Sequence, residues 1–207
     1  MIPNGTHPAA QLSDVEMIVP DTRLAREAEQ EARARLSTSM LEHSYRTYFF
    51  GQALATLDGV QVDEELSWTA AMLHDIELEH PAQGRCFAVR GAEHAEQFMT
   101  SLGEPPQRVV LVRDGIAGHI TLGVESDLSD IAGFLAAGAG ADLVGARCQD
   151  IDPDWMGSVI ESHPRLQFKQ VVIAAVRAET AAVPGGRLAV THAAGLELMI
   201  NAAPFNE

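Results

Sequence analysis

The chain has 207 residues, of which 46% are hydrophobic, 21% are charged and 5% are aromatic, and its formal net charge is −15. A chain of this length and composition can bury a substantial core, and its negative charge disfavours nucleic acid as a partner because it repels phosphate. No uncharged apolar run is long enough to span a bilayer, and the N-terminus lacks the features of a signal peptide, so we expect no membrane partner and a cytoplasmic location.

Helical periodicity recurs along the chain, whereas strand-like alternation of useful length is absent. Residues 1–20 contain several prolines and are expected to form an irregular arm, and residues 21–207 are expected to form one helical domain. Asp21, Ser39 and Asp63 are the predicted N-caps of the first three helices. In chain order, helices are predicted over 22–36, 40–57, 65–78, 91–102, 107–120, 130–146, a short stretch from Pro153, 165–183 after Pro164, and 189–200.

These elements predict an all-α bundle of about eight to ten helices. The helix over 130–146 is rich in Gly and Ala, and its small side chains would permit close packing against a neighbouring helix. Cys86 and Cys148 are not arranged in a CxxC motif, so two buried, reduced thiols are expected rather than a disulfide or a zinc site.

The pair His74-Asp75 lies at the end of an apolar helical segment, AAMLHD, where burying an uncompensated charge would be costly. A divalent metal ion would compensate that charge, with the imidazole and the carboxylate as ligands. His43 upstream and Asp142 downstream complete a set of two histidines and two carboxylates. This mixed set suits Zn, Mn, Fe or Ni better than Ca, and an ion with open positions can activate water.

The segments HSYRTYFFG, AAMLHDIEL, FAVRGAEHAEQF and IAGHI, taken with Asp142, resemble the H…HD…D pattern of the HD-domain superfamily of metal-dependent hydrolases. Their order and spacing are most similar to the cyanamide hydratase-like branch. The resemblance covers about residues 41–146 and implies an HD-type helical bundle. It also implies a metal site formed by His43, His74, Asp75 and Asp142.

Two further histidines, His94 and His119, occupy the interval in which some HD proteins carry ligands for a second metal. One ion is favoured and two remain an alternative, because His94 also fits a helix surface beside Glu93. His119 follows an apolar stretch, and we expect it to bind substrate, transfer protons or bind a second metal, the alternative being a core histidine. Arg46 lies one turn after His43, so it is expected to contact either an anionic substrate or a carboxylate near the metal.

The resulting hypothesis is a metal-dependent hydrolase or hydratase acting on a small polar molecule such as cyanamide or a nitrile. His119, Arg46 and Asp75 are the candidate catalytic residues, and the partner is a small-molecule substrate. Whether the chain forms a homo-oligomer is left open. The alternatives are a phosphohydrolase, which the scarcity of basic residues disfavours, a di-iron oxygenase, and a non-catalytic regulatory protein.

Overall fold

The computed structural model describes residues 17–207, so most of the predicted N-terminal arm, residues 1–16, lies outside the described residues. Within 17–207 the regular elements are ten α-helices and short 3₁₀ turns without a strand, which confirms the predicted all-α bundle. The helices are α1 (Arg23–Arg35), α2 (Thr38–Leu57), α3 (Glu64–Leu73), α4 (Phe87–Ser101), α5 (Pro106–Gly118), α6 (Ile131–Val144), α7 (Pro153–Ser162), α8 (Phe168–Ala182), α9 (Arg187–Ala193) and α10 (Leu196–Ala202). The 3₁₀ turns are η2 (Val124–Ser126) and η3 (Cys148–Asp150).

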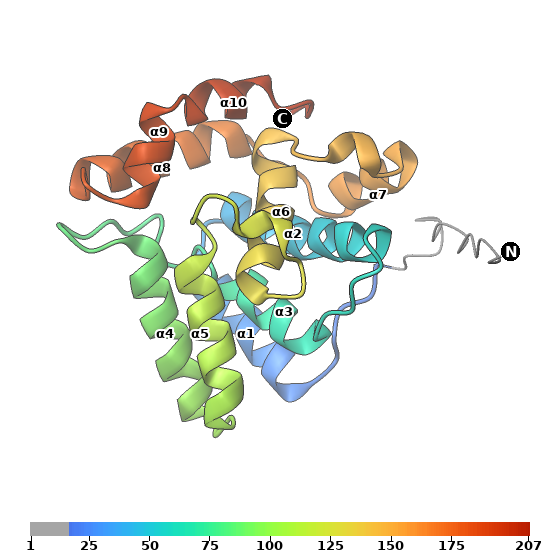
Figure 1. The fold of residues 1–207 in the computed structure, drawn as a ribbon, viewed down its shortest axis with the longest axis vertical. Coiled ribbons are helices and arrows are strands. Elements are labelled where there is room, and N and C mark those ends of the chain that lie inside the picture. The colour runs from blue at the N-terminus through green and yellow to red at the C-terminus, as the bar shows by residue number, and fades with distance from the viewer. Residues whose placement is uncertain (1–16) are drawn as a thin grey trace, which may run out of the picture.

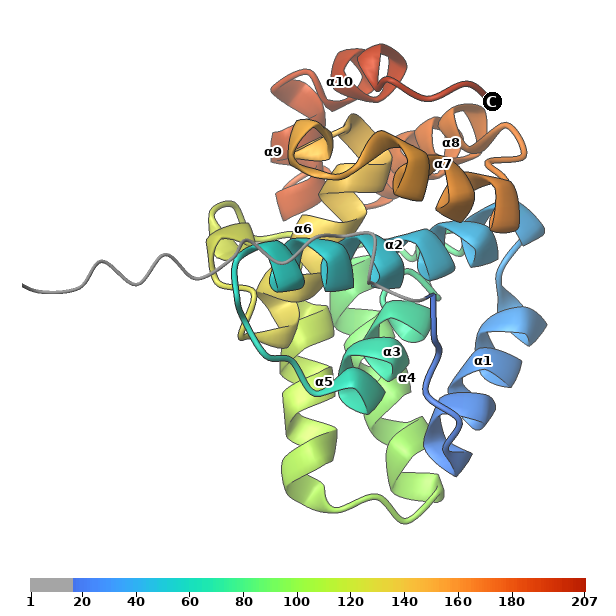
Figure 2. The same ribbon diagram turned by 90° about the vertical axis from the view of Figure 1, so that its right-hand side faces the viewer.

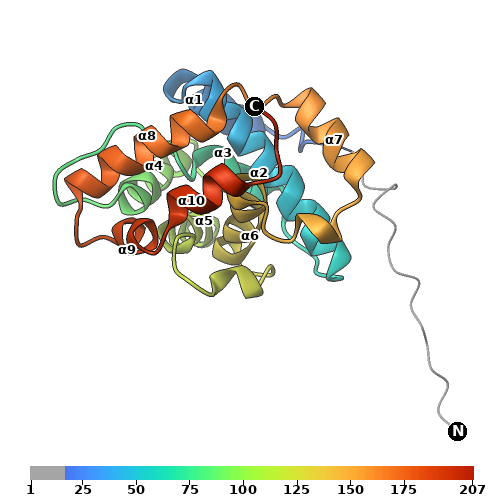
Figure 3. The same ribbon diagram turned by 90° about the horizontal axis from the view of Figure 1, so that it is seen from above.

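Helix α2 crosses the middle of the molecule, with α1, α3, α4 and α5 on one side and α7 to α10 on the other (Figures 1 and 2). Helix α6 crosses α2 in close contact and connects the two halves (Figures 1 and 2). Seen from above, α8, α9 and α10 lie over the ends of α4, α5 and α6 (Figure 3). The C-terminal helices therefore cover the region where α2, α3, α5 and α6 meet.

The close contact between α2 and α6 depends on Gly138. A Cβ atom at Gly138 would lie 2.1 Å from the carbonyl oxygen of Thr47 in α2, so no larger residue fits there without displacing the backbone. One turn from this contact, His43 precedes Thr47 and Asp142 follows Gly138. The small residues that the sequence predicted to permit close packing therefore bring His43 and Asp142 together.

Several predicted helix ends are wrong by a few residues. The first helix is capped by Thr22 instead of Asp21, because the Thr22 hydroxyl accepts the N–H of Ala25 at 3.1 Å. The second is capped by Ser37 instead of Ser39, whereas Asp63 caps α3 as predicted. The predicted helix over 65–78 ends at Leu73.

Tertiary contacts account for the other differences. Helix α4 begins at Phe87 instead of residue 91, because the Glu179 carboxylate of α8 accepts the Phe87 N–H at 2.8 Å. The helix predicted from residue 165 begins at Phe168, since the preceding Leu166 and Gln167 have positive φ angles. The single helix predicted over 189–200 is two helices, α9 and α10, separated by Gly195 at φ 103°.

Across residues 17–207, no helix combines the length and the hydropathy that crossing a bilayer would require. Both cysteines are free thiols. Cys148 is buried as expected, whereas Cys86 is only half-buried.

Candidate metal centre

The His74-Asp75 pair sits where α3 ends. Helix α3 stops at Leu73, and residues 74–79 continue as turns. The loosened backbone lets both adjacent side chains face the same interior space, which neighbouring residues in a regular helix do not do. Both residues are buried, with exposed fractions of 0% for His74 and 6% for Asp75.

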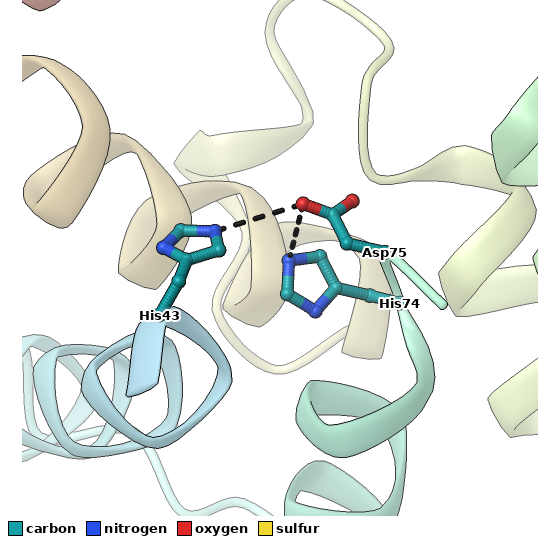
Figure 4. Close-up of side chains that lie close together, drawn as sticks. All are labelled: His43, His74 and Asp75. Atoms are coloured by element: carbon teal, nitrogen blue, oxygen red, sulfur yellow. Dashed lines mark ion pairs between the residues drawn. The ribbon is translucent and has the colours of Figure 1, made fainter. Parts of the chain in front are cut away.

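Three imidazoles surround the carboxylate of Asp75. The Nε2 atom of His74 lies 3.3 Å from Oδ2 of Asp75, and that of His43 in α2 lies 3.7 Å from the same oxygen (Figure 4). From the end of α5, Nε2 of His119 lies 3.6 Å from Oδ1. The potential ligand atoms of His43, His74 and Asp75 all lie within 4.8 Å of one another.

The other ring nitrogen of each histidine is already committed as a donor. Nδ1 of His74 donates to the carbonyl of Ala71 at 2.8 Å, and Nδ1 of His119 donates to the carbonyl of Ile116 at 2.6 Å. Nδ1 of His43 donates to the carboxylate of Asp142 at 2.6 Å. In the neutral rings, these bonds leave the Nε2 lone pair directed toward Asp75, and that of His43 is also 3.5 Å from the Thr47 hydroxyl. A ring whose Nδ1 is held as a donor and whose Nε2 faces the site is the arrangement that metal-binding histidines adopt.

The donor set fits a divalent metal ion. Nε2 of His74 is fully buried and makes no hydrogen bond of good geometry, although it lies 3.3 Å from a carboxylate oxygen of Asp75. A lone pair beside a carboxylate is unfavourable unless a proton or a metal cation lies between them. Two or three imidazoles with one carboxylate are ligands typical of Zn, Mn, Fe or Ni.

Electrostatics keep Asp75 ionised despite its burial. Burial alone would raise the pKa of Asp75, but the charge of His74 and hydrogen bonding to His119 and His74 hold that pKa well below its usual range. Burial, the largest single effect, would lower the pKa of His74, but the charge of Asp75 together with hydrogen bonding to Asp75 and to the Ala71 carbonyl outweighs it, and the net shift is upward. Without a metal, therefore, the Asp75 carboxylate favours the protonated form of His74.

The fourth residue of the predicted ligand set, Asp142, is not part of this cluster. Its carboxylate is fully buried and accepts from Arg46 through Nε at 2.8 Å and through a terminal nitrogen at 2.9 Å. Arg165 donates to it at 2.5 Å and His43 at 2.6 Å. Burial alone would raise its pKa, but the charge of Arg46 and the His43 hydrogen bond lower it strongly. Asp142 thus contacts the cluster only through the Nδ1 side of His43.

The remaining predicted site residues lie in different places. Arg46 is fully buried, pairs with Asp142, donates to the carbonyls of residues 163 and 164, and does not line the cavity described below. His119 does line it. His94 lies outside the cluster, and its Nε2 is 2.9 Å from Glu31 of α1. His94 and His119, the predicted second-metal pair, are therefore not brought together.

A cavity of about 320 Å³ opens beside the cluster. His43, His74, Asp75 and His119 form its polar end, and most of its remaining lining is aliphatic. Its size is at the small end of the range for ligand pockets, roughly 300–1,000 Å³. The four residues therefore face a space that can admit a small molecule.

The sequence argument did not identify two supporting residues in the C-terminal part. Phe168 of α8 stacks on the His43 ring with centroids 4.6 Å apart, and Arg165 is the second guanidinium on Asp142. Neither has a local sequence signal, because Phe168 acts through the packing of α8 on α2 and Arg165, which precedes α8, acts through its contact with Asp142 of α6. Only their positions in the folded chain reveal them.

Comparison with known proteins agrees with the fold and the cluster. The family model of the HD domain matches residues 40–136. This segment contains His43, His74, Asp75 and His119, and it ends before Asp142. No match was found among curated proteins. The comparisons thus support an HD domain and leave the reaction unspecified.

Proposed function

We propose that this chain is a metal-dependent hydrolase or hydratase of the HD type, in which His43, His74 and Asp75 hold a divalent ion. The observation that carries the proposal is the buried cluster in which Nε2 of His74 faces the Asp75 carboxylate at 3.3 Å and the potential ligand atoms of His43, His74 and Asp75 all lie within 4.8 Å of one another. The match to the HD domain, a family consisting largely of metal-dependent hydrolases, supports the same assignment. When bound, such an ion would supply Lewis-acid chemistry that activates water or polarises a carbonyl or nitrile.

The protein residues have separate tasks in this proposal. His119 lines the cavity, and its Nδ1 is fixed as a donor, so its Nε2, which lies 3.6 Å from Oδ1 of Asp75, is the atom that would exchange a proton or a hydrogen bond with the substrate. Asp75 supplies the negative charge that attracts the ion. Asp142 keeps the proton of His43 on Nδ1, and Arg46 acts through Asp142 as a positioning residue.

Metal analysis is the first test. Protein purified without added metal should contain one equivalent of Zn, Fe, Mn or Ni per chain, and His74→Ala and Asp75→Ala should lose it. His94→Ala is the matched control, because His94 is a partly buried histidine that contacts Glu31 instead of the cluster. Two irons per chain with a visible absorption band would instead support the di-iron oxygenase alternative.

An activity screen with amides, nitriles, cyanamide and phosphomonoesters is the second test. In His119→Ala, we expect kcat to fall by about 10²–10⁴-fold, as for loss of a general acid or base, while the metal content stays unchanged. If the Asp75→Ala variant turns over every substrate of the wild type at an unchanged rate, the chain is a binding or regulatory protein.

A further inference from the structure

The cavity beside the cluster has an apolar wall supplied by the C-terminal helices. Val172 and Val176 of α8 and Leu196 of α10 are buried lining residues, each at most 5% exposed. Met199, also of α10, lines it at 50% exposure and therefore lies toward its mouth. These helices follow the segment that matches the HD domain, residues 40–136, and α10 packs against both α6 and α8. The wall is therefore a feature of this chain outside the matched domain.

Helix α6 leaves space on the opposite side. Its residues facing the cavity include Ala136, Ala137, Ala139 and Gly140. These residues have the smallest side chains, so the space that larger residues would fill stays open between α6 and the C-terminal helices. The volume of about 320 Å³ exceeds what a molecule as small as cyanamide needs.

The cavity lining offers no free cation to an anionic ligand. Among the described residues, Arg147 is the only arginine or lysine in the lining, and its guanidinium binds both carboxylate oxygens of Asp58 at 2.8 Å and Asp150 at 2.9 Å. Glu125 adds a carboxylate. Arg187, outside the lining, donates to the hydroxyl of Thr121 and to the backbone. A phosphate group normally needs several cations for binding, so this lining disfavours it.

We propose that the cavity binds a neutral substrate with an apolar body, whose single hydrolysable polar group faces Asp75 and His119. This inference rests on the proposed function, because that function makes the polar end of the cavity the place where the substrate reacts. It replaces the small polar molecule expected from the sequence by a larger, mostly apolar one. The apolar body lies between α6 and the wall formed by α8 and α10.

Binding to the metal-free protein tests this directly, because it does not require turnover. Straight-chain carboxamides from butanamide to octanamide are titrated calorimetrically alongside alkyl phosphates of the same chain lengths. Each methylene added within the cavity should tighten amide binding about three- to fourfold, until the chain reaches the mouth. The binding heat capacity should also become more negative with chain length. Octyl phosphate should bind at least about tenfold more weakly than octanamide, since its charge meets an unfavourable lining.

Variants test where the alkyl chain of the bound amide lies. Ala139→Leu fills part of the cavity and should weaken octanamide at least about tenfold while leaving butanamide nearly unchanged. Met199→Asp places a charge at the mouth and should weaken octanamide similarly. Leu198→Asp is the matched control, because Leu198 is the neighbouring α10 residue, is 76% exposed and does not line the cavity. Met199 and Leu198 are both exposed enough to be replaced without unfolding the protein, which circular dichroism verifies.

The outcomes separate this inference from the proposed function. Octyl phosphate binding as tightly as octanamide, or affinity independent of chain length, would overturn the inference while metal binding and hydrolysis could still stand. Equal effects of Met199→Asp and Leu198→Asp would also overturn it. A clear chain-length effect in a protein that binds no metal and hydrolyses nothing would support the apolar cavity and reject the proposed function.

Discussion

Replacing Asp142 by Asn distinguishes a structural carboxylate from a metal ligand. Within residues 17–207, Asp142 is the only carboxylate that pairs with Arg46, and it shares Arg165 with Glu207. Both guanidinium groups are buried, and each would remain as a buried charge without its partner. Removing one partner of a buried ion pair costs about 3–5 kcal/mol, a large part of the roughly 5–15 kcal/mol that stabilises a typical protein.

We therefore expect Asp142→Asn to lower the unfolding free energy of the metal-free protein by about 3–5 kcal/mol. For a chain of this length that is a fall in Tm of about 6–20 °C. Zinc affinity should fall by no more than about 100-fold, the usual effect of losing a group that only orients a ligand. Urea unfolding of the metal-free protein and competitive zinc titration measure the two effects.

Asp75→Asn is the matched control, since Asp75 is also a buried carboxylate but has histidine neighbours. It should lose most of the zinc affinity with a smaller loss of stability, because an imidazole can release its proton when its partner disappears. If Asp142→Asn leaves the metal-free protein within about 1 kcal/mol of wild type and abolishes zinc binding, the reasoning is refuted and the four-ligand set predicted from the sequence is restored.

Three further predictions concern packing and ionisation. Gly138→Ala should destabilise the fold by about 1–3 kcal/mol or more in urea unfolding, because its Cβ would meet the Thr47 carbonyl. The control Gly140→Ala, whose Cβ would have its nearest contact at 3.6 Å, should be neutral or stabilising by up to about 1 kcal/mol. Burial raises the pKa of Tyr48 to about 12. The stability that this shift contributes, roughly 2–3 kcal/mol, is present below the unfolded pKa near 10 and is lost as the pH rises toward 12. Alkaline unfolding should therefore accompany the ionisation of Tyr48 measured at about 295 nm, and ionisation near pH 10 in the intact fold would contradict this. Burial raises the pKa of the Cys148 thiol to about 11, so a thiol reagent at pH 8 should label it only after unfolding, and rapid labelling of both cysteines in native protein would argue against it.

Local sequence signals were sufficient for the helices and for the metal-binding residue types. The apolar periodicity predicted an all-α bundle, and Asp63 was correctly identified as a cap, because periodicity and capping involve residues close in sequence. The helix predicted over 65–78 ran past His74-Asp75, whereas α3 ends at Leu73 and leaves that pair in a turn. Helix ends that depend on a distant partner were not predictable: α4 begins at Phe87 because Glu179, from α8, accepts its N–H.

The residue types of the candidate centre could be predicted from the sequence, but which of these residues lie together in one cluster could not. His43, His74 and Asp75 have the chemistry of metal ligands wherever they meet, so their pattern indicated a site before any coordinates. Asp142 has the same chemistry, yet packing brings Arg46 and Arg165 onto its oxygens and directs it to the far side of the His43 ring. A carboxylate binds whichever cations surround it, and those neighbours come from other helices. Only the tertiary structure decides which cations surround Asp142, just as only the packing of the C-terminal helices creates the apolar cavity.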